Sequence, residues 1–234
     1  MTSIDYRDFD ALTFDCYGTL IDWEAGLLAG LRAFLDSRSV TASDDEVLER
    51  YARTEAELER GPYLTYREIL GQGLAAVGTA YGHVPSTAEV DAFGGSVADW
   101  PAFPDSAAAL ARLKERFRLG VLTNCDDDLF AASNRRLDVT FDWVITAQQA
   151  RGYKPRIANF ELAFERIGLP RERILHVAQS LFHDHVPAKA LGMTTVWIDR
   201  RHGRPGSGAT PPAAATPDAT FVDMTSFAEA ATRS

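Results

Sequence analysis

The chain of 234 residues carries a net charge of −9 and is 46% hydrophobic and 24% charged, a composition typical of a folded globular protein with one or two domains. That charge argues against a basic surface for nucleic acid, and the longest apolar runs are too short to cross a membrane. Two cysteines, Cys16 and Cys125, make no disulfide framework, and the first residues lack the basic and apolar regions of a signal peptide. We therefore expect a cytoplasmic protein with reduced thiols that binds neither nucleic acid nor membranes.

The first predicted element is a short strand that ends at an acid. The run Ala11-Leu12-Thr13-Phe14 is followed by Asp15, and then by Gly18 and Thr19. This pattern predicts a buried strand that delivers Asp15 to its carboxyl end before a tight loop. Open α/β sheets place their chemistry at that edge. An ordinary turn containing Asp would explain the same residues, so the spacing alone leaves both interpretations open.

The next stretch, residues 22–100, has helical periodicity and no β-branched runs. Apolar spacing, a capping-box pair at Ser43 and Glu46, and a break at Gly61-Pro62 divide it into helices. The helices are predicted at 24–35, 43–59, 65–81 and from 87 onward. The prolines at 101 and 104 then fix an extended crossing back. We expect residues 22–100 to form a small helical cap domain, inserted into a core domain made of 1–21 and 101–234.

Strand and helix signals alternate through the rest of the chain. Strands are predicted at 118–122, 141–146, 174–178, 194–198 and near Phe221, with helices at 105–117, after 126, at 156–167, after 182 and at the end of the chain. This alternation implies a parallel sheet with right-handed crossovers. The predicted fold class is therefore α/β, a doubly wound (Rossmann-like) parallel sheet with an inserted helical cap. Residues 200–217, rich in Gly, Pro and Ala, are predicted to form a surface loop.

The segment from Asp15 to Leu20, after an apolar strand, resembles the first motif of the haloacid dehalogenase superfamily. Tyr17, two positions after the Asp, is similar to the type II (L-2-haloacid dehalogenase) branch. Phosphatases of the superfamily carry an acid there to protonate a leaving oxygen, and a phenol with a pKa near 10 is a poor substitute. A halide leaves without a proton. The resemblance implies that Asp15 is the nucleophile, that Thr19 orients it, and that Cys16 and Tyr17 contact the substrate, although Cys16 without a Cys-His motif also fits a buried filler.

A second motif closes the strand predicted at 118–122. Thr123-Asn124 resembles the superfamily pair whose hydroxyl and amide contact the anionic part of the substrate. A Thr-Asn pair at this position is also a common helix cap, so both interpretations stay open.

A third motif is Lys154, between Tyr153 and Pro155. It resembles the superfamily lysine whose ammonium pairs with the nucleophilic Asp and with charge that develops on the substrate.

The fourth motif runs from Val177 to Asp184. Superfamily phosphatases carry two acids here that help to hold Mg²⁺. In this chain Ser180 replaces the first acid, so we expect neither a metal ion nor another cofactor, and we place Ser180 among the substrate-binding residues. Asp184 is the candidate base for the water that cleaves an enzyme ester, and His183 or His185 could assist it.

The resemblance departs from the dehalogenase branch at a few positions. Gln179, Leu181 and Phe160 replace polar residues of that branch. Its cap arginine, which receives the halide and the carboxylate, could correspond to Arg53; Arg50, Arg60 and Arg67 are the alternatives.

The expected function is hydrolysis of small 2-substituted carboxylic acids through an aspartyl ester, similar to a 2-haloacid dehalogenase. Three alternatives remain from the sequence: a hydrolase of azetidine-2-carboxylate by the same mechanism, an Mg²⁺-dependent small-molecule phosphatase, and an inactive binding protein of the same fold. The expected partner is a small carboxylate substrate. Homodimers are common in this superfamily, so the resemblance also allows a homodimer.

Overall fold

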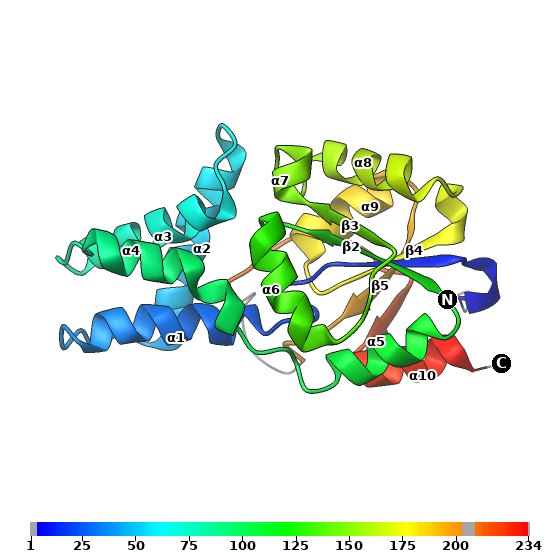
Figure 1. The fold of residues 1–234 in the computed structure, drawn as a ribbon, viewed down its shortest axis with the longest axis horizontal. Helices are drawn as coiled ribbons and strands as arrows, with labels where there is room; N and C mark the ends of the chain where they lie inside the picture. The colour runs from blue at the N-terminus through cyan, green and yellow to red at the C-terminus, as the bar shows by residue number, and fades with distance from the viewer. Residues whose placement is uncertain (1–3, 203–208, 234) are drawn as a thin grey trace.

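The computed structural model describes residues 4–202 and 209–233. Its centre is a six-stranded parallel sheet in the order β3-β2-β1-β4-β5-β6 (Figure 1). The strands are β1 (Ala11–Phe14), β2 (Arg118–Thr123), β3 (Trp143–Thr146), β4 (Ile174–Ala178), β5 (Thr194–Ile198) and β6 (Ala219–Phe221). All four residues of β1 are buried, as expected for a central strand covered on both faces. The predicted α/β fold class is confirmed.

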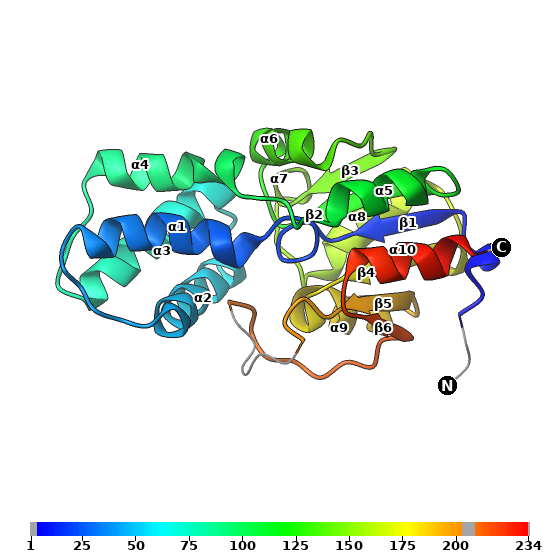
Figure 2. The same ribbon diagram turned by 90° about the horizontal axis from the view of Figure 1, so that it is seen from below.

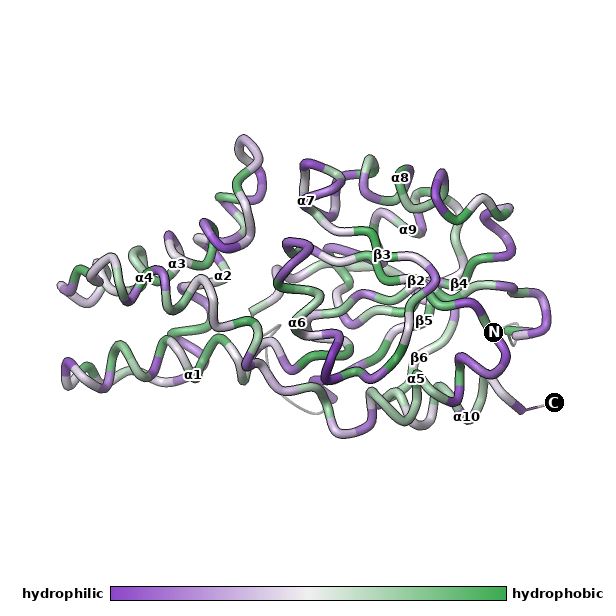
Figure 3. The backbone as a smooth tube through the Cα atoms, in the orientation of Figure 1, coloured by the Kyte–Doolittle hydropathy of each residue, from purple (hydrophilic) through white to green (hydrophobic). Residues whose placement is uncertain are grey.

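Helices cover both faces of this sheet (Figures 1 and 2). On one face lie α5 (Ser106–Lys114), α6 (Asp127–Leu137) and α10 (Met224–Thr232), and on the other α7 (Ala147–Ala150), α8 (Ile157–Ile167) and α9 (Val186–Ala190). Three short 3-10 turns are η1 (Tyr6–Asp8), η2 (Ser96–Asp99) and η3 (Arg171–Arg173), and η4 (Leu181–His185) is a single π-helical segment. Hydrophobic residues line the strands, and hydrophilic ones gather in the outer loops (Figure 3). Within 4–202 and 209–233, no helix combines the length and apolar character needed to cross a bilayer.

Four further helices lie together beyond one end of the sheet (Figures 1 and 2). They are α1 (Trp23–Asp36), α2 (Asp44–Arg60), α3 (Tyr66–Ala80) and α4 (Thr87–Gly95). Ser43 caps α2, and reciprocal capping boxes start α3 (Thr65 with Glu68) and α4 (Ser86 with Glu89). The division of the chain into a cap of 22–100 and a core of 1–21 and 101–234 stays a prediction.

A shared hydrophobic cluster and hydrogen bonds join these four helices to the sheet and its loops. One cluster of buried hydrophobic residues is continuous from Phe14 in β1 through Leu27 in α1 to Leu70 in α3. Asp126, which follows β2, accepts hydrogen bonds from the backbone N–H groups of Tyr66 and Arg67 at 3.0 and 3.1 Å. A carboxylate is stabilised at this position because the N-terminus of a helix presents unpaired N–H groups and a partial positive charge. The loop between β2 and α6, which contains Asp126, therefore fixes the start of α3 over the carboxyl edge of the sheet.

Candidate active site

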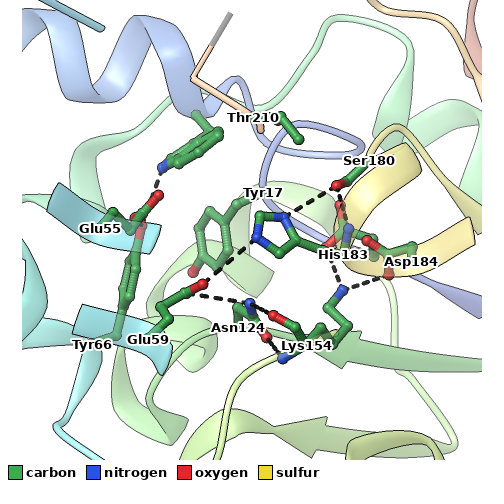
Figure 4. A pocket seen from close by; sticks show the side chains of 12 residues that line it. Tyr17, Glu55, Glu59, Tyr66, Asn124, Lys154, Ser180, His183, Asp184 and Thr210 are labelled. Carbon is green, nitrogen blue, oxygen red and sulfur yellow. Dashed lines mark hydrogen bonds and ion pairs between the residues drawn. The ribbon is translucent and has the colours of Figure 1, made fainter. Parts of the chain in front are cut away.

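The loops that follow the strands meet at the carboxyl edge of the sheet, beneath α2 and α3, around a small cavity of about 40 Å³ (Figure 4). The sheet contributes Asp15, Tyr17, Asn124, Lys154, Ser180, His183 and Asp184 to its wall. The helical segment contributes Trp23, Glu55, Glu59 and Tyr66, and Thr210 completes the lining. Parallel strands bring their carboxyl ends to one edge, so residues far apart in the sequence converge here.

Asp15 is held in a fixed orientation directly after β1. Its backbone N–H donates to Val177 O at 3.1 Å, and its Oδ2 accepts the Thr19 hydroxyl at 2.6 Å. Thr19 Oγ1 in turn accepts the backbone N–H of Gln179 at 2.9 Å, which leaves its own proton for the carboxylate. Gly18 makes the turn between Asp15 and Thr19 possible because its φ of +92° is a backbone conformation that residues with a side chain rarely adopt. The loop after β1 thus points one carboxylate into the cavity.

Lys154 joins the two aspartates of the site. Its Nζ donates to Asp15 Oδ1 at 2.9 Å, to Asp184 Oδ1 at 2.7 Å and to Leu122 O at 2.8 Å, so all three N–H groups are used. The side chain is 1% exposed. Burial opposes its charge, but the two carboxylates outweigh burial and raise the pKa of Lys154. Asn124 fixes the lysine backbone by accepting its N–H at 2.7 Å.

Asp184 lies in η4 and is fully buried. Its Oδ1 also contacts His176 Nε2 at 3.0 Å, whereas its buried Oδ2 has no hydrogen-bond partner among the described residues. Burial opposes ionisation, yet Lys154 and His176 hold the pKa of Asp184 well below its usual value. Burial, with the nearby charge of Asp184, instead raises the pKa of Asp15, against the effect of Lys154 and Thr19. Asp15 is the more basic carboxylate of the two, which suits a nucleophile, and the free oxygen of Asp184 suits a water molecule.

Two acids also face the cavity from α2. Glu55 Oε1 accepts the hydroxyls of Tyr51 and Tyr66, both at 3.1 Å. Glu59 Oε1 accepts Asn124 Nδ2 at 3.3 Å, and its Oε2 lies 3.6 Å from His183 Nε2. Burial raises the pKa of Glu55 to about 8 and, with the charge of Glu55, raises the pKa of Glu59 well above its usual value.

The residues of the site do not fit a magnesium ion. The ammonium of Lys154 already bridges the two carboxylates, and the Ser180 hydroxyl accepts the backbone N–H of His183 at 2.9 Å. A hard divalent ion prefers several free carboxylate oxygens in one place. No group of three or more His, Cys, Asp or Glu side chains in the described part of the chain is arranged to hold a metal. No step below uses a metal.

Tyr17 and the two histidines beside Asp184 make contacts within the protein. Tyr17 lines the wall, but its hydroxyl hydrogen-bonds Ser133 at 2.9 Å and accepts the Cys125 thiol at 3.4 Å. Burial raises the pKa of Tyr17 well above its ordinary value. Of the two histidines beside Asp184, His183 lines the cavity, whereas His185 contacts Ala178 O at 2.9 Å.

Other predicted substrate-binding residues are not on the cavity wall. Cys16 and Thr123 are fully buried and do not line it. The side chain of Arg53 is 75% exposed, pairs with Glu49 at 3.8 Å and lines an outer cavity that shares Thr210 with the cavity of the site. Residue 53 lies on the face of α2 that turns away from the sheet, because buried positions on this helix are set by the stripe through Tyr51 and Glu55.

The alternative arginines also lie elsewhere. Arg60 lines the same outer cavity as Arg53, Arg50 pairs with Glu46 at 3.5 Å, and Arg67 pairs with Asp128 at 2.7 Å. The described part of the cavity wall therefore contains no arginine.

Sequence reasoning missed Glu55, Glu59 and His176. Tyr51, Glu55 and Glu59 follow one another at intervals of four, so they share one face of a helix with the buried Leu48. Two acids on the apolar face of an amphipathic helix were the feature of the sequence that could have identified Glu55 and Glu59. His176 stands inside the buried strand β4, where its Nδ1 contacts Thr13 Oγ1 at 2.9 Å.

Comparisons with known proteins show similarity to haloacid dehalogenases. The family model of haloacid dehalogenase-like hydrolases matches residues 9–190. Haloacetate dehalogenase H-2 of Moraxella sp. (strain B) is 28% identical over 207 residues, which cover 83% of this chain and 87% of that protein. The (S)-2-haloacid dehalogenase of Pseudomonas putida is 24% identical over 208 residues, with 84% and 87% covered.

The fold is similar to that of solved dehalogenases. The L-2-haloacid dehalogenase from Xanthobacter autotrophicus with chloropropionic acid covalently bound has a TM-score of 0.78 and 20% identity, with 94% of this chain and 97% of that chain covered. The chain therefore belongs to the haloacid dehalogenase-like hydrolases. The predicted superfamily and the prediction of a hydrolase are confirmed.

Proposed function

We propose that this hydrolase acts on small 2-substituted carboxylic acids through an ester on Asp15, in the manner of a 2-haloacid dehalogenase. The observation that carries the proposal is the Asp15 carboxylate, which faces the cavity while Thr19 and Lys154 fix its two oxygens at 2.6 and 2.9 Å. The curated relatives named above are dehalogenases, and a structure of similar fold holds chloropropionic acid covalently. Tyr17 and Ser180 stand where a phosphatase needs acids, and both hydrogen-bond within the protein.

In the first step, one Asp15 oxygen attacks C2 of the substrate from the side opposite the leaving group. The new C–O bond forms as the bond from C2 to the leaving group breaks, and a halide departs with the bonding electrons. No proton is needed for that departure, which is consistent with a Tyr17 hydroxyl that is turned toward Ser133. Fixed orientation of the carboxylate lowers the entropic part of the barrier.

In the second step, water attacks the carboxyl carbon of the Asp15 ester. The unpartnered Oδ2 of Asp184 accepts a proton from this water, and Lys154 balances the negative charge that develops beside it. The tetrahedral intermediate then collapses: the alkoxide takes the proton held by Asp184 and leaves as the 2-hydroxy acid, and the Asp15 carboxyl group releases the second water proton to solvent and becomes a carboxylate again. Because only the first step touches C2, the product has inverted configuration.

The direct test is chloride release from (S)-2-chloropropionate by the wild-type protein and by Asp15→Asn. We expect turnover by the wild type with (R)-lactate as product, and loss of several orders of magnitude in Asp15→Asn, because an amide is a far weaker nucleophile. Asp91→Asn, at an exposed position on α4, is the matched control and keeps full activity. Unchanged chloride release by Asp15→Asn would end the proposal.

A further inference from the structure

The wall that faces Asp15 from α2 is acidic. Glu55 and Glu59 lie one helical turn apart, are 5% and 9% exposed, and direct their carboxyl groups into the cavity (Figure 4). Among the described residues of the cavity wall, Lys154 carries the single fixed positive charge. Its N–H groups are all donated to Leu122, Asp15 and Asp184 on the sheet side. Among the described residues, the hydrogen bonds to the two glutamate carboxyl groups therefore come from neutral side chains.

Neutral donors hold the two glutamates in place. Trp23 Nε1 donates to the Tyr66 hydroxyl at 3.1 Å, and that hydroxyl donates to Glu55 Oε1, so the carboxyl is oriented by a chain of hydrogen bonds. Asn124 Nδ2 orients Glu59 by donating a hydrogen bond to its Oε1 at 3.3 Å. Such preorganised acceptors in a buried place are costly unless an opposite charge reaches them.

The neighbouring histidine does not supply that charge. His183 Nδ1 lies 3.1 Å from Ser180 Oγ, and its Nε2 lies 3.6 Å from Glu59. Burial lowers the pKa of His183 to about 4, so the imidazole is neutral near pH 7. A cation that pairs with the two glutamates is therefore not supplied by His183, and a bound molecule could supply it.

We infer that Glu55 and Glu59 bind a protonated nitrogen of the substrate, so that the preferred substrate is a 2-substituted carboxylic acid that also carries an ammonium group. The inference rests on the proposed function and names its substrate class. Burial raises the pKa of both glutamates, although the charges of Lys154 and Arg156 act against this rise at Glu59, and a bound ammonium would favour the ionised forms of both. The cavity of about 40 Å³ favours a small substrate. The rival arrangement, in which both glutamates stay protonated and donate to a substrate carboxylate, predicts the opposite preference.

The binding test uses unreactive probes, 3-aminopropanoate and propanoate, titrated into the wild-type protein by calorimetry at pH 7.5. The two molecules differ by the ammonium group alone. We expect 3-aminopropanoate to bind about tenfold or more tightly than propanoate, because a charge-assisted hydrogen bond in a buried site contributes at least that factor. The preference should disappear in Glu59→Gln and fall in Glu55→Gln. Glu49→Gln, on the same helix with a side chain 64% exposed, is the matched control and should retain it.

The kinetic test compares kcat/KM for 3-amino-2-chloropropanoate and 2-chloropropanoate in the same four proteins. A higher kcat/KM for the amine, lost in Glu59→Gln, supports the inference. Equal or better use of 2-chloropropanoate, with a ratio that neither glutamate variant changes, would overturn it and leave the dehalogenase chemistry intact. Failure of the proposed function looks different: neither compound would release chloride, although the calorimetric preference and its loss in Glu59→Gln would persist.

Discussion

The Thr19 hydroxyl lies 2.6 Å from Asp15 Oδ2 while its oxygen accepts the Gln179 backbone N–H at 2.9 Å. The hydroxyl therefore has one orientation, and it links the loop after β1 to the loop after β4. Both loops carry catalytic candidates, so one small side chain sets the angle at which the nucleophile meets its substrate.

Replacing this side chain with one of similar shape tests that role. Thr19→Val removes the donor to Asp15 and leaves the Gln179 N–H without its partner in a part-buried place. Hydrogen bonds to charged groups contribute about 1.5–3 kcal/mol, so we expect kcat to fall roughly 10- to 100-fold and the free energy of unfolding to fall by about 2 kcal/mol. Steady-state kinetics and urea denaturation measure the two effects. Thr19→Ser, which keeps the hydroxyl, should retain most of the activity, and a Thr19→Val protein with normal kcat would remove Thr19 from the mechanism.

Lys154→Met should lower the free energy of unfolding more than the loss of any exposed charged side chain does. The change leaves Asp15 and Asp184 buried without their shared cation, and breaking a buried pair in this way costs about 3–5 kcal/mol. The loss should shrink as pH falls from 7.5 to 5, because unpaired buried carboxylates can take up protons. Lys114→Met removes a partly exposed ion pair with Asp142 and should cost less than about 1 kcal/mol at either pH. Urea denaturation at both pH values makes the comparison, and equal losses for the two variants would contradict the account of the site.

Asp184→Asn separates the two chemical steps. Attack by Asp15 does not require a base, whereas cleavage of the ester does, so we expect the ester to form and its hydrolysis to slow about 100-fold or more. Mass spectrometry of the intact protein after mixing with substrate should show a substrate-derived mass on Asp15. His183→Asn is the comparison, since His183 also lines the cavity. Accumulation of the ester in His183→Asn but not in Asp184→Asn would transfer the role of base to His183.

Glu55→Gln should change the pH dependence of stability in a defined direction. Burial raises the pKa of Glu55 to about 8 in the folded protein from an ordinary 4.5, so its folded form binds the proton more tightly. The stability contributed by that proton is full below about pH 4.5 and is lost as pH rises through about 8. Gln has no proton to lose. As pH rises from 5 to 8, the difference in free energy of unfolding between Glu55→Gln and wild type should therefore shift by a few kcal/mol in favour of Glu55→Gln. Thermal unfolding across that range tests this, and a constant difference would show that the folded carboxyl titrates normally.

Sequence patterns predicted the sheet well, and they brought the candidate site residues to one edge of it, for a physical reason. The strands β4 and β5 occupy 174–178 and 194–198 as predicted, because buried parallel strands are short apolar runs bounded by helical periodicity. Asp15 and Asp184 were found because each follows a strand, and strand ends converge in this fold. The helix α7, with four residues, was not predicted, since one turn is too short to show a period.

The cap side of the cavity was much less predictable. The periodicity of α2 shows that Glu55 shares a face with Tyr51, but not that this face covers the end of the sheet. That relationship depends on contacts between distant segments, such as the carboxylate of Asp126 at the start of α3. The same limit applies to Arg53, which was predicted from its residue type and whose side chain lines the outer cavity.

The most direct test of the account is a single turnover of (S)-2-chloropropionate in water enriched in ¹⁸O, with protein in excess of substrate, followed by mass spectrometry of the peptide that contains Asp15. If the nucleophile is Asp15, the lactate oxygen comes from its carboxylate and the heavy oxygen appears in Asp15. Heavy oxygen in lactate, with an unlabelled Asp15, would mean that water attacks C2 directly and would contradict the covalent mechanism.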